Sequence, residues 1–146
     1  MFEEIIKEKT SADHLLYVSL KYTKTCDVIL NLLARWKSLI EISFDSLIEK
    51  YIELGKIKEK PLSPKQRIEF MRSFFKKIEM IQNVIPLYIF FKRVPDLRKS
   101  REGEFRKNVN LKVKTPKETV CINLEKLAEY SAQIDLFIQE VKKILL

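Results

Sequence analysis

The stretch from Ala12 to Leu54 constrains the fold of this chain most, because it contains neither glycine nor proline. Its apolar residues recur at steps of three and four, which is the spacing of one face of an α-helix. They are Leu15, Val18, Tyr22, Cys26, Ile29 or Leu30, Leu33, Trp36, Ile40, Phe44, Leu47 and Tyr51. The pattern predicts a long helix with its N-cap at Ser11, a bend near Ser43 and a second helix to Leu54. Trp36 continues the apolar stripe and is predicted to be buried.

Capping residues predict where further helices begin and end. A short helix over Phe2–Lys9 precedes the long one, and Gly55 is positioned to end the helix that reaches Leu54. The sequence Ser63-Pro64-Lys65-Gln66 has the form of a capping box, with serine at the N-cap and proline at the first helical position. Pro86 lacks an amide proton, so we expect the next helix to kink or restart near Val84.

The hydrophobic spacing changes from helical to alternating in the last third of the chain. Apolar residues alternate with polar ones on both sides of a four-residue turn over 115–118, which predicts a two-stranded β-hairpin. The alternating residues are Val109, Leu111, Val113, Val120 and Ile122. Asn123 is then the predicted N-cap of a final helix, whose apolar residues again step by three and four.

These elements predict an all-α fold, a bundle of about five helices with a small β-hairpin before the C-terminal helix. A chain of 146 residues has the usual size of one domain, so we assign residues 1–146 to a single helical-bundle domain. Hydrophobic residues make up 46% of the sequence, which is enough for a core without disulfide bonds. The aromatic residues Tyr88, Phe90 and Phe91 belong to an all-apolar segment and are predicted to pack in that core rather than to stack on bases.

Positive charge is concentrated in the segment Lys92–Lys117. The segment holds ten basic and three acidic residues, which gives it +7 of the chain's formal net charge of +8. Clustered lysine and arginine are typical of proteins that bind a polyanion. A solvated, charge-rich surface without a partner is the alternative interpretation. The predicted nucleic-acid-binding residues are Arg98, Lys99, Arg101, Arg106, Lys107, Lys112, Lys114 and Lys117.

The residue types needed for most catalytic and metal sites are missing from the sequence. His14 is the only histidine, and glycine occurs only at positions 55 and 103, which excludes a Cys/His zinc cluster and a glycine-rich phosphate loop. We therefore expect no metal and no cofactor, and the sequence favours a protein without enzymatic activity. Cys26 and Cys121 lie far apart among apolar residues, and both are predicted to be buried, reduced thiols.

The sequence predicts a cytoplasmic protein without membrane association. Its N-terminus, MFEEIIKEK, has acidic residues where a secretory signal has basic ones. The longest apolar run, Ile85–Phe91, is far shorter than the roughly 20 residues that a helix needs to span a bilayer.

The basic segment also carries a sequence pattern of its own. Leu97-Arg98-Lys99-Ser100-Arg101 precedes Glu102–Asn108, and Ile122-Asn123 precedes a closing amphipathic helix. This arrangement resembles the C-terminal part of HEPN-type helical proteins, which include RNA-cutting toxins and partners of minimal nucleotidyltransferases. That family carries an R-x4–6-H motif at the start of a helix. Arg101 matches the arginine of the motif.

The histidine of that motif is missing, because its allowed positions hold Arg106, Lys107 and Asn108. A ribonuclease of this type needs a group that exchanges a proton with the 2′-hydroxyl near neutral pH. Arginine and lysine bind phosphate but are poor bases. The resemblance therefore implies binding or partner recognition more than cleavage.

Three functions agree with these features. The first is a non-catalytic binding protein that docks a polyanion, RNA in the first place, on the 92–117 segment. The second is a protein-interaction module, either a homodimer or the small subunit of a two-protein, toxin–antitoxin-like system. Its contact surface would be a second apolar row on the last helix (Tyr130, Phe137 and Ile144), although a wide buried face explains that row better. The third is a HEPN-like ribonuclease with an atypical base.

Overall fold

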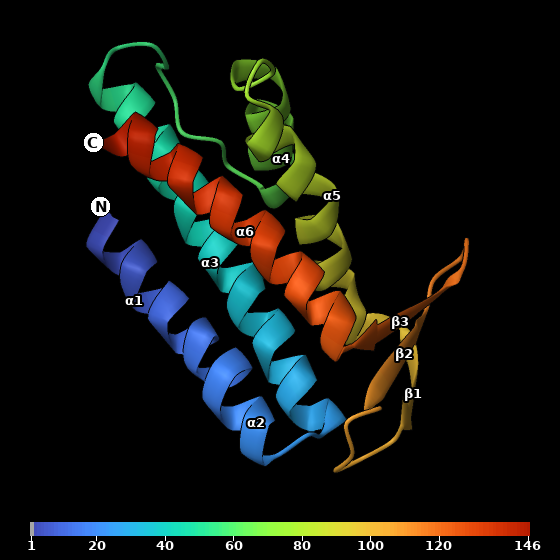
Figure 1. Cartoon of the computed structure of the whole chain (residues 1–146). Coiled ribbons are helices and arrows are strands. Elements are labelled where there is room, and N and C mark those ends of the chain that lie inside the picture. The colour runs from blue at the N-terminus through green and yellow to red at the C-terminus, as the bar shows by residue number, and fades with distance from the viewer. Residues whose placement is uncertain (1) are drawn as a thin grey trace.

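The computed structural model describes residues 2–146, which form a bundle of helices with a small antiparallel sheet at one end (Figure 1). The N-terminal helical segment comprises α1 (Phe2–His14), a π-helical stretch (Leu15–Ser19) and α2 (Leu20–Tyr22). The other helices are α3 (Cys26–Glu53), α4 (Pro64–Phe74), α5 (Glu79–Arg93) and α6 (Leu124–Leu145), with a 3₁₀ turn at Val94–Asp96. The strands are β1 (Arg98–Glu102), β2 (Asn110–Lys114) and β3 (Thr119–Asn123). None of the helices within residues 2–146 combines the length and the apolarity needed to cross a membrane.

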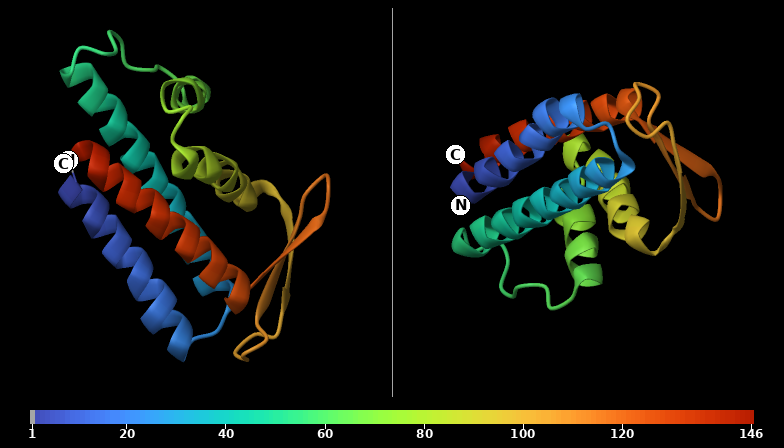
Figure 2. Two further views of the ribbon diagram at one scale, coloured as in Figure 1. Left: turned by 45° about the horizontal axis from the view of Figure 1, so that its top comes forward. Right: turned by 90° about the horizontal axis from the view of Figure 1, so that it is seen from below.

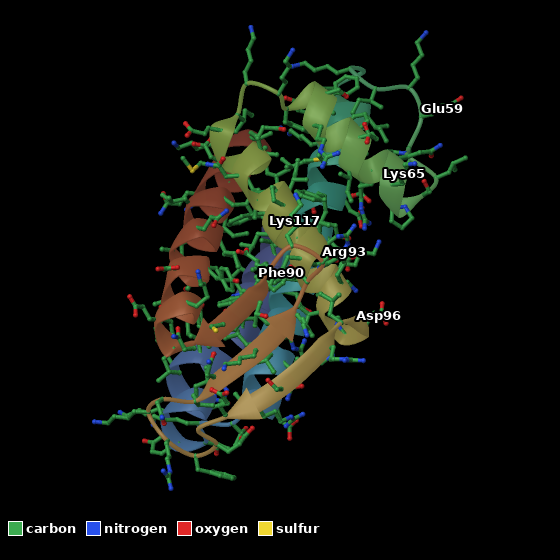
Figure 3. The ribbon with its side chains drawn as sticks, turned by 90° about the vertical axis from the view of Figure 1, so that its right-hand side faces the viewer. Glu59, Lys65, Phe90, Arg93, Asp96 and Lys117 are labelled. Atoms are coloured by element: carbon green, nitrogen blue, oxygen red, sulfur yellow. The ribbon has the colours of Figure 1, made fainter. Side chains whose placement is uncertain are left out.

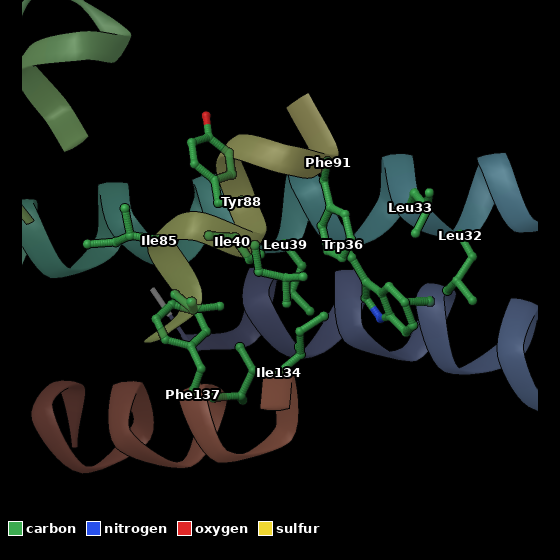
Figure 4. Packing of buried hydrophobic residues seen from close by; sticks show 14 of the residues in the cluster. Leu32, Leu33, Trp36, Leu39, Ile40, Ile85, Tyr88, Phe91, Ile134 and Phe137 are labelled. Atoms are coloured by element: carbon green, nitrogen blue, oxygen red, sulfur yellow. The ribbon is translucent and has the colours of Figure 1, made fainter. Parts of the chain in front are cut away.

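The central helix of the bundle is α3. It contacts α1, α5 and α6, which surround it (Figures 1 and 2). Trp36 of α3 is 2% exposed, and its ring lies 5.9 Å from that of Phe91 and 6.3 Å from that of Tyr130, centroid to centroid. Buried side chains from α3, α5 and α6 converge in this region (Figure 4). The predicted burial of Trp36, Tyr88 and Phe91 is confirmed, while Phe90 is partly buried and packs against the core.

The predicted N-cap of the long helix at Ser11 and the predicted bend near Ser43 are wrong. Ser11 and Ser43 both lie inside helices, where each hydroxyl donates to the carbonyl four residues earlier, at 3.3 and 2.8 Å. The chain breaks instead at residues 23–25, and Thr25 is the N-cap of α3, accepting from the Val28 N–H at 3.3 Å. The apolar spacing runs across this break because the helices on both sides of it bury residues in the same core. Hydrophobic periodicity alone therefore gave no signal of the break.

The predicted end of α3 and the predicted start of α4 are confirmed. Gly55 has a φ of +72° and ends α3, with its N–H donating to the Ile52 carbonyl. Ser63 is the N-cap of α4, and its hydroxyl accepts from the Gln66 N–H at 3.2 Å. The Gln66 side chain accepts in turn from the Leu62 N–H at 2.9 Å, which completes a capping-box-like pair of hydrogen bonds.

Of the two outcomes predicted near Val84, a kink or a restart, the restart does not occur. Pro86 lies inside α5, and the break between α4 and α5 comes earlier, at residues 75–78. The Gln82 side-chain amide donates to the carbonyls of Met71 and Phe75, at 3.1 and 2.9 Å, and so satisfies the free end of α4. Helix α5 thus accommodates Pro86 in its interior. At the break between α4 and α5, the Gln82 side chain replaces hydrogen bonds that the helix end lacks.

The final helix begins and packs as predicted. The Asn123 side chain is its N-cap and accepts from the Lys126 N–H at 2.8 Å. In the second apolar row, Phe137 is fully buried, while Tyr130 and Ile144 are partly buried and pack against the core. The row therefore widens the buried face of α6 and is not a free contact surface.

The β-region has one strand more than predicted. The hairpin of β2 and β3 with its turn at 115–118 is confirmed, but β1 adds a third strand, in the order β1-β2-β3 with both pairs antiparallel. An all-α description is therefore too strict, although the helical bundle itself is confirmed. The sequence of β1, RKSRE, gave no sign of a strand because four of its five residues are exposed and none is apolar.

Candidate nucleic-acid interface

The sheet has a buried inner face and an exposed outer face. Leu111, Val113 and Ile122 point inward and are fully buried. Their alternate neighbours point the other way, and the strand register aligns Arg98 with Lys114. We define the outer sheet face as Arg98, Ser100, Glu102, Lys112, Lys114, Thr119 and Cys121. Figure 3 shows the sheet at the front of the molecule, with no helix in front of it.

The outer sheet face holds three cationic side chains around a shallow hollow of about 570 Å³. Arg98, Lys112 and Lys114 line the hollow together with Ser100, Thr119 and Cys121, and Lys99 also contributes to its lining. This is the chemistry that binds an anionic group, since cations and hydroxyl donors surround one cavity. The single acidic residue on this face, Glu102, pairs with Lys112 at 2.8 Å, and this hydrogen bond raises the pKa of the lysine.

Lys99 of β1 also lines the hollow, although the strand register places it beside the inward-pointing Val113. Its ammonium group donates to the carbonyls of Val94, Pro95 and Leu97, at 2.9, 3.1 and 2.8 Å. These carbonyls belong to the turn that joins α5 to β1. Lys99 therefore stabilises this connection, and its charge is already engaged within the protein.

Arg101 also has a structural partner. Its guanidinium lies 2.8 Å from the Asp27 carboxylate in the first turn of α3, and 4.0 Å from Glu104. The hydrogen bond to Asp27 raises the pKa of Arg101. Arg101 therefore ties β1 to the start of the central helix. It lies in a strand, followed by turns at 104–108, whereas the HEPN-type motif begins a helix.

The loop after β1 completes the N-terminal end of α3. The Glu104 carboxylate accepts from the Cys26 N–H at 3.3 Å, so a negative charge caps the positive end of the helix dipole. The Cys26 thiol donates to the Asn110 carbonyl at 3.5 Å. Burial, and secondly the nearby Glu104, raises the pKa of this thiol to about 11. Cys26 is thus the buried, inert thiol that the sequence predicts.

Cys121 is exposed, contrary to the prediction that both thiols are buried. It lies on β3 next to Ile122, and adjacent strand residues point to opposite faces of a sheet. Ile122 takes the inward position and is fully buried, so Cys121 must face outward. The apolar neighbours of Cys121 therefore identified a strand but not the face on which the thiol lies.

Arg106 and Lys107 lie away from the outer sheet face, on the loop between β1 and β2. Both are exposed, and this loop is tied to the connection between α2 and α3 by a hydrogen bond from the Phe105 N–H to the Lys24 carbonyl, at 2.7 Å. The loop, the end of α2 and the connection that follows it lie at one end of the molecule (Figure 1). They carry four basic residues, which we call the basic tip: Lys21, Lys24, Arg106 and Lys107.

Lys117 lies at the other end of the sheet, in the turn between β2 and β3 (Figure 3). It lines a hollow that also contains Phe90 of α5. The structure thus divides the predicted site residues by location. Arg98, Lys112 and Lys114 share one face, and Arg106 and Lys107 belong to the basic tip. Lys99 borders the hollow but its ammonium group is bound to backbone carbonyls, and Arg101 and Lys117 lie elsewhere.

His14 lies on a different part of the surface. It is exposed and lines a polar hollow of about 800 Å³ between α1 and α3, which also contains Asn31 and Arg35. Within residues 2–146, no three of the histidine, cysteine and acidic side chains are grouped as a metal site would require.

Sequence reasoning missed two features of the basic segment, the strand β1 and the exposed Phe105. The only available signal was an aromatic residue flanked by charged ones.

Comparisons with models of known protein families, with curated protein sequences and with solved structures give no significant match for this chain. The resemblance to HEPN-type proteins therefore stays a prediction.

Proposed function

We propose that this protein is a non-catalytic nucleic-acid-binding protein that docks RNA on the outer sheet face. The carrying observation is the hollow formed by Arg98, Lys112 and Lys114 with two hydroxyl groups. Residues two apart along a strand lie about 6.7 Å apart. Lys114 and Lys112, the latter paired with Glu102, therefore present separate cationic groups along β2, and Arg98 on β1 lies opposite Lys114. Such a series of cations suits a chain of phosphates better than a single small anion.

We propose RNA rather than another polyanion because of the resemblance to HEPN-type proteins. We propose binding rather than cleavage because of the residues that surround Arg101. The side chains beside that arginine are two carboxylates, Asp27 and Glu104, and both make contacts that hold the start of α3. The chain's one histidine, His14, lies in the hollow between α1 and α3. We therefore expect purified protein to leave RNA uncut.

The alternative of a protein-interaction module receives no support from the row on α6, since Phe137 is buried and Tyr130 packs on Trp36. A homodimer or a protein partner would have to use another surface. Sedimentation of the protein at several concentrations measures self-association independently of RNA binding.

The proposed function is tested by the salt dependence of binding to a fluorescently labelled RNA. Log affinity should fall linearly with log salt, with a slope of about 0.7 for each phosphate contacted on a single strand. The double change Arg98→Ala with Lys114→Ala should weaken binding and reduce the slope by the contribution of one or two contacts.

Lys76→Ala with Lys77→Ala is the matched control. Both lysines are exposed, make no ion pair among the described residues, and lie in the turn before α5, at the opposite end of that helix from the sheet. The control removes the same charge and should have little effect. Equal losses in both double variants would indicate non-specific attraction by a basic protein. Absence of binding even at low salt would exclude the proposed function.

A further inference from the structure

Two large aromatic side chains are exposed at the end of the molecule that carries the basic tip. Tyr22 is 78% exposed and Phe105 is 75% exposed. They lie on the two segments joined by the hydrogen bond between Phe105 and Lys24. The other aromatic residues are buried or partly buried, except Tyr17 and Phe74, which are less exposed than these two. Leaving a phenyl ring in water forgoes the free energy of burial.

The backbone holds Phe105 in a conformation that its residue type disfavours. Its φ is +66°, in the left-handed region that non-glycine residues rarely adopt. Hydrogen bonds fix the loop around it, since the Phe105 N–H donates to Lys24 and the Arg106 N–H donates to the Gly103 carbonyl at 3.0 Å. Such a conformation persists only where the surrounding structure enforces it, and it is often found at binding sites.

The cations around the two rings have no carboxylate partner within residues 2–146, although the Lys24 ammonium donates to the Lys21 carbonyl at 2.7 Å and the Lys21 ammonium lies 5.8 Å from the centroid of the Tyr22 ring. Among the described residues, Lys21, Lys24, Arg106 and Lys107 make no ion pair. The acidic groups nearby are already engaged, because Asp27 pairs with Arg101 and Glu104 caps α3. The basic tip therefore combines unpaired cations with exposed aromatic rings.

We infer that the basic tip binds unpaired nucleobases, by stacking them on Phe105 and Tyr22 while its cations contact the adjoining phosphates. This inference rests on the proposed function and narrows it to single-stranded RNA. Aromatic rings beside lysine and arginine are the means by which proteins hold single strands, since every base has a face that can stack. In a duplex the bases are stacked on one another and are not available to the tip.

The size and charge of this surface favour a nucleic acid over the other macromolecules that seek exposed rings. A stable protein interface buries about 1,200 to 2,000 Å² and is depleted in charged residues at its centre. Two rings among four cations provide neither the apolar area nor that depletion. Anionic lipid vesicles remain a second polyanionic surface, and the experiment below includes them as a competing outcome.

The test compares binding of wild-type protein, Phe105→Leu and Tyr22→Leu to a single-stranded RNA and to a duplex of the same length. Each leucine variant removes a stacking ring without changing charge. Each should weaken single-strand binding by at least about fivefold. The slope of log affinity against log salt and the affinity for the duplex should stay unchanged. Circular dichroism and thermal melting check that the variants fold.

Phe105→Trp provides a direct reading of stacking. The chain's only tryptophan, Trp36, is buried, so the new indole is the one that can meet a base. This variant should keep the wild-type affinity, and single-stranded RNA should quench its added fluorescence while a duplex should not.

The outcomes separate this inference from the proposed function. If the leucine variants bind single-stranded RNA like the wild type while Arg98→Ala with Lys114→Ala still weakens binding, the stacking inference is overturned and the proposed function stands. If Phe105→Leu loses affinity for vesicles of phosphatidylserine but not for RNA, the basic tip binds a membrane surface, and the stacking inference is also overturned. If no variant and no wild-type protein binds RNA, both fail together.

Discussion

The helical bundle and the β-sheet of this protein use their side chains in opposite ways. In α3, α5 and α6, large side chains such as Trp36 and Phe137 are buried against one another. In the sheet only the inner residues, Leu111 among them, belong to that core, while the outer face carries exposed cations. The bundle and the inner face of the sheet therefore form the core, while the outer sheet face presents cations to the solvent. The following changes test that division.

The largest expected effect is the loss of the ring at the centre of the bundle. Trp36→Ala should lower the free energy of unfolding by roughly 3–5 kcal/mol, because it leaves a cavity between Phe91 and Tyr130. Chemical denaturation measures the change. Tyr22→Ala, which removes an exposed ring, should stay within about 0.5 kcal/mol of the wild type. A similar stability for both variants would mean that burial at Trp36 does not support the bundle.

The second effect concerns the loop that joins the sheet to the start of α3. Gly103 has a φ of +64°, and a Cβ there would lie 2.6 Å from the Asn108 carbonyl oxygen. Gly103→Ala should therefore cost about 2–4 kcal/mol, from the left-handed conformation and the clash with backbone. Gly55 has a similar φ, +72°, but a Cβ there would meet no atom within 4 Å. Gly55→Ala should therefore lower the free energy of unfolding by only about 1–2 kcal/mol. Equal costs at the two glycines would show that the β1–β2 loop can move away from the clash.

The third effect is a dependence of stability on alkaline pH that comes from the bundle. Burial, with a smaller contribution from Glu129, raises the pKa of Tyr130 from 10.0 to about 12. Between these values the unfolded chain has lost the phenolic proton and the folded protein has kept it. The free energy of unfolding should therefore fall as the pH rises from about 10 to about 12.

Tyr130→Phe should make this decrease shallower, because phenylalanine has no proton to lose. Denaturation at a series of pH values measures it, with the exposed Tyr22→Phe as the matched control. Identical profiles for Tyr130→Phe and the wild type would contradict the assigned burial of that hydroxyl group.

The smallest effect distinguishes two arginines of the same strand. Arg101 pairs with Asp27 at the start of α3, whereas Arg98 lines the hollow of the outer sheet face. Arg101→Ala should lower the melting temperature slightly and change RNA affinity little. Arg98→Ala should weaken RNA binding and leave the melting temperature nearly unchanged. Thermal melting and RNA titration of both variants give the answer. A larger loss of binding in Arg101→Ala would move the interface to the inner side of β1.

The sequence predicted the bundle better than the sheet for physical reasons. Apolar periodicity identified the buried faces of α3 and α6, since burial selects residue type at every turn. It did not locate the break before Thr25, because both helices face one core. Nor did it reveal β1, whose strand depends on hydrogen bonds to β2 and not on apolar residues.

The candidate site was predicted as a segment but not as a surface. The concentration of basic residues identified the segment 92–117. The sequence alone does not distinguish Lys99 and Arg101, which bind other parts of the protein, from Arg98 and Lys112 on the outer sheet face. Only the strand alternation and the tertiary partners separate them, since Lys99 binds backbone carbonyls and Arg101 binds a carboxylate on α3. Charge in a sequence thus indicates how much cationic surface exists, and the fold decides which part of it is free.

The central claim, that the sheet binds and the bundle stabilises, is tested most directly by mapping amide resonances during titration with single-stranded RNA. We expect the largest shifts at β1, β2 and β3 around Arg98, Lys112 and Lys114, and at the loop containing Phe105. Amides of α4 and of the α1–α3 hollow around His14 should not move. The largest shifts in that hollow or in α4, with none in the sheet, would contradict the claim.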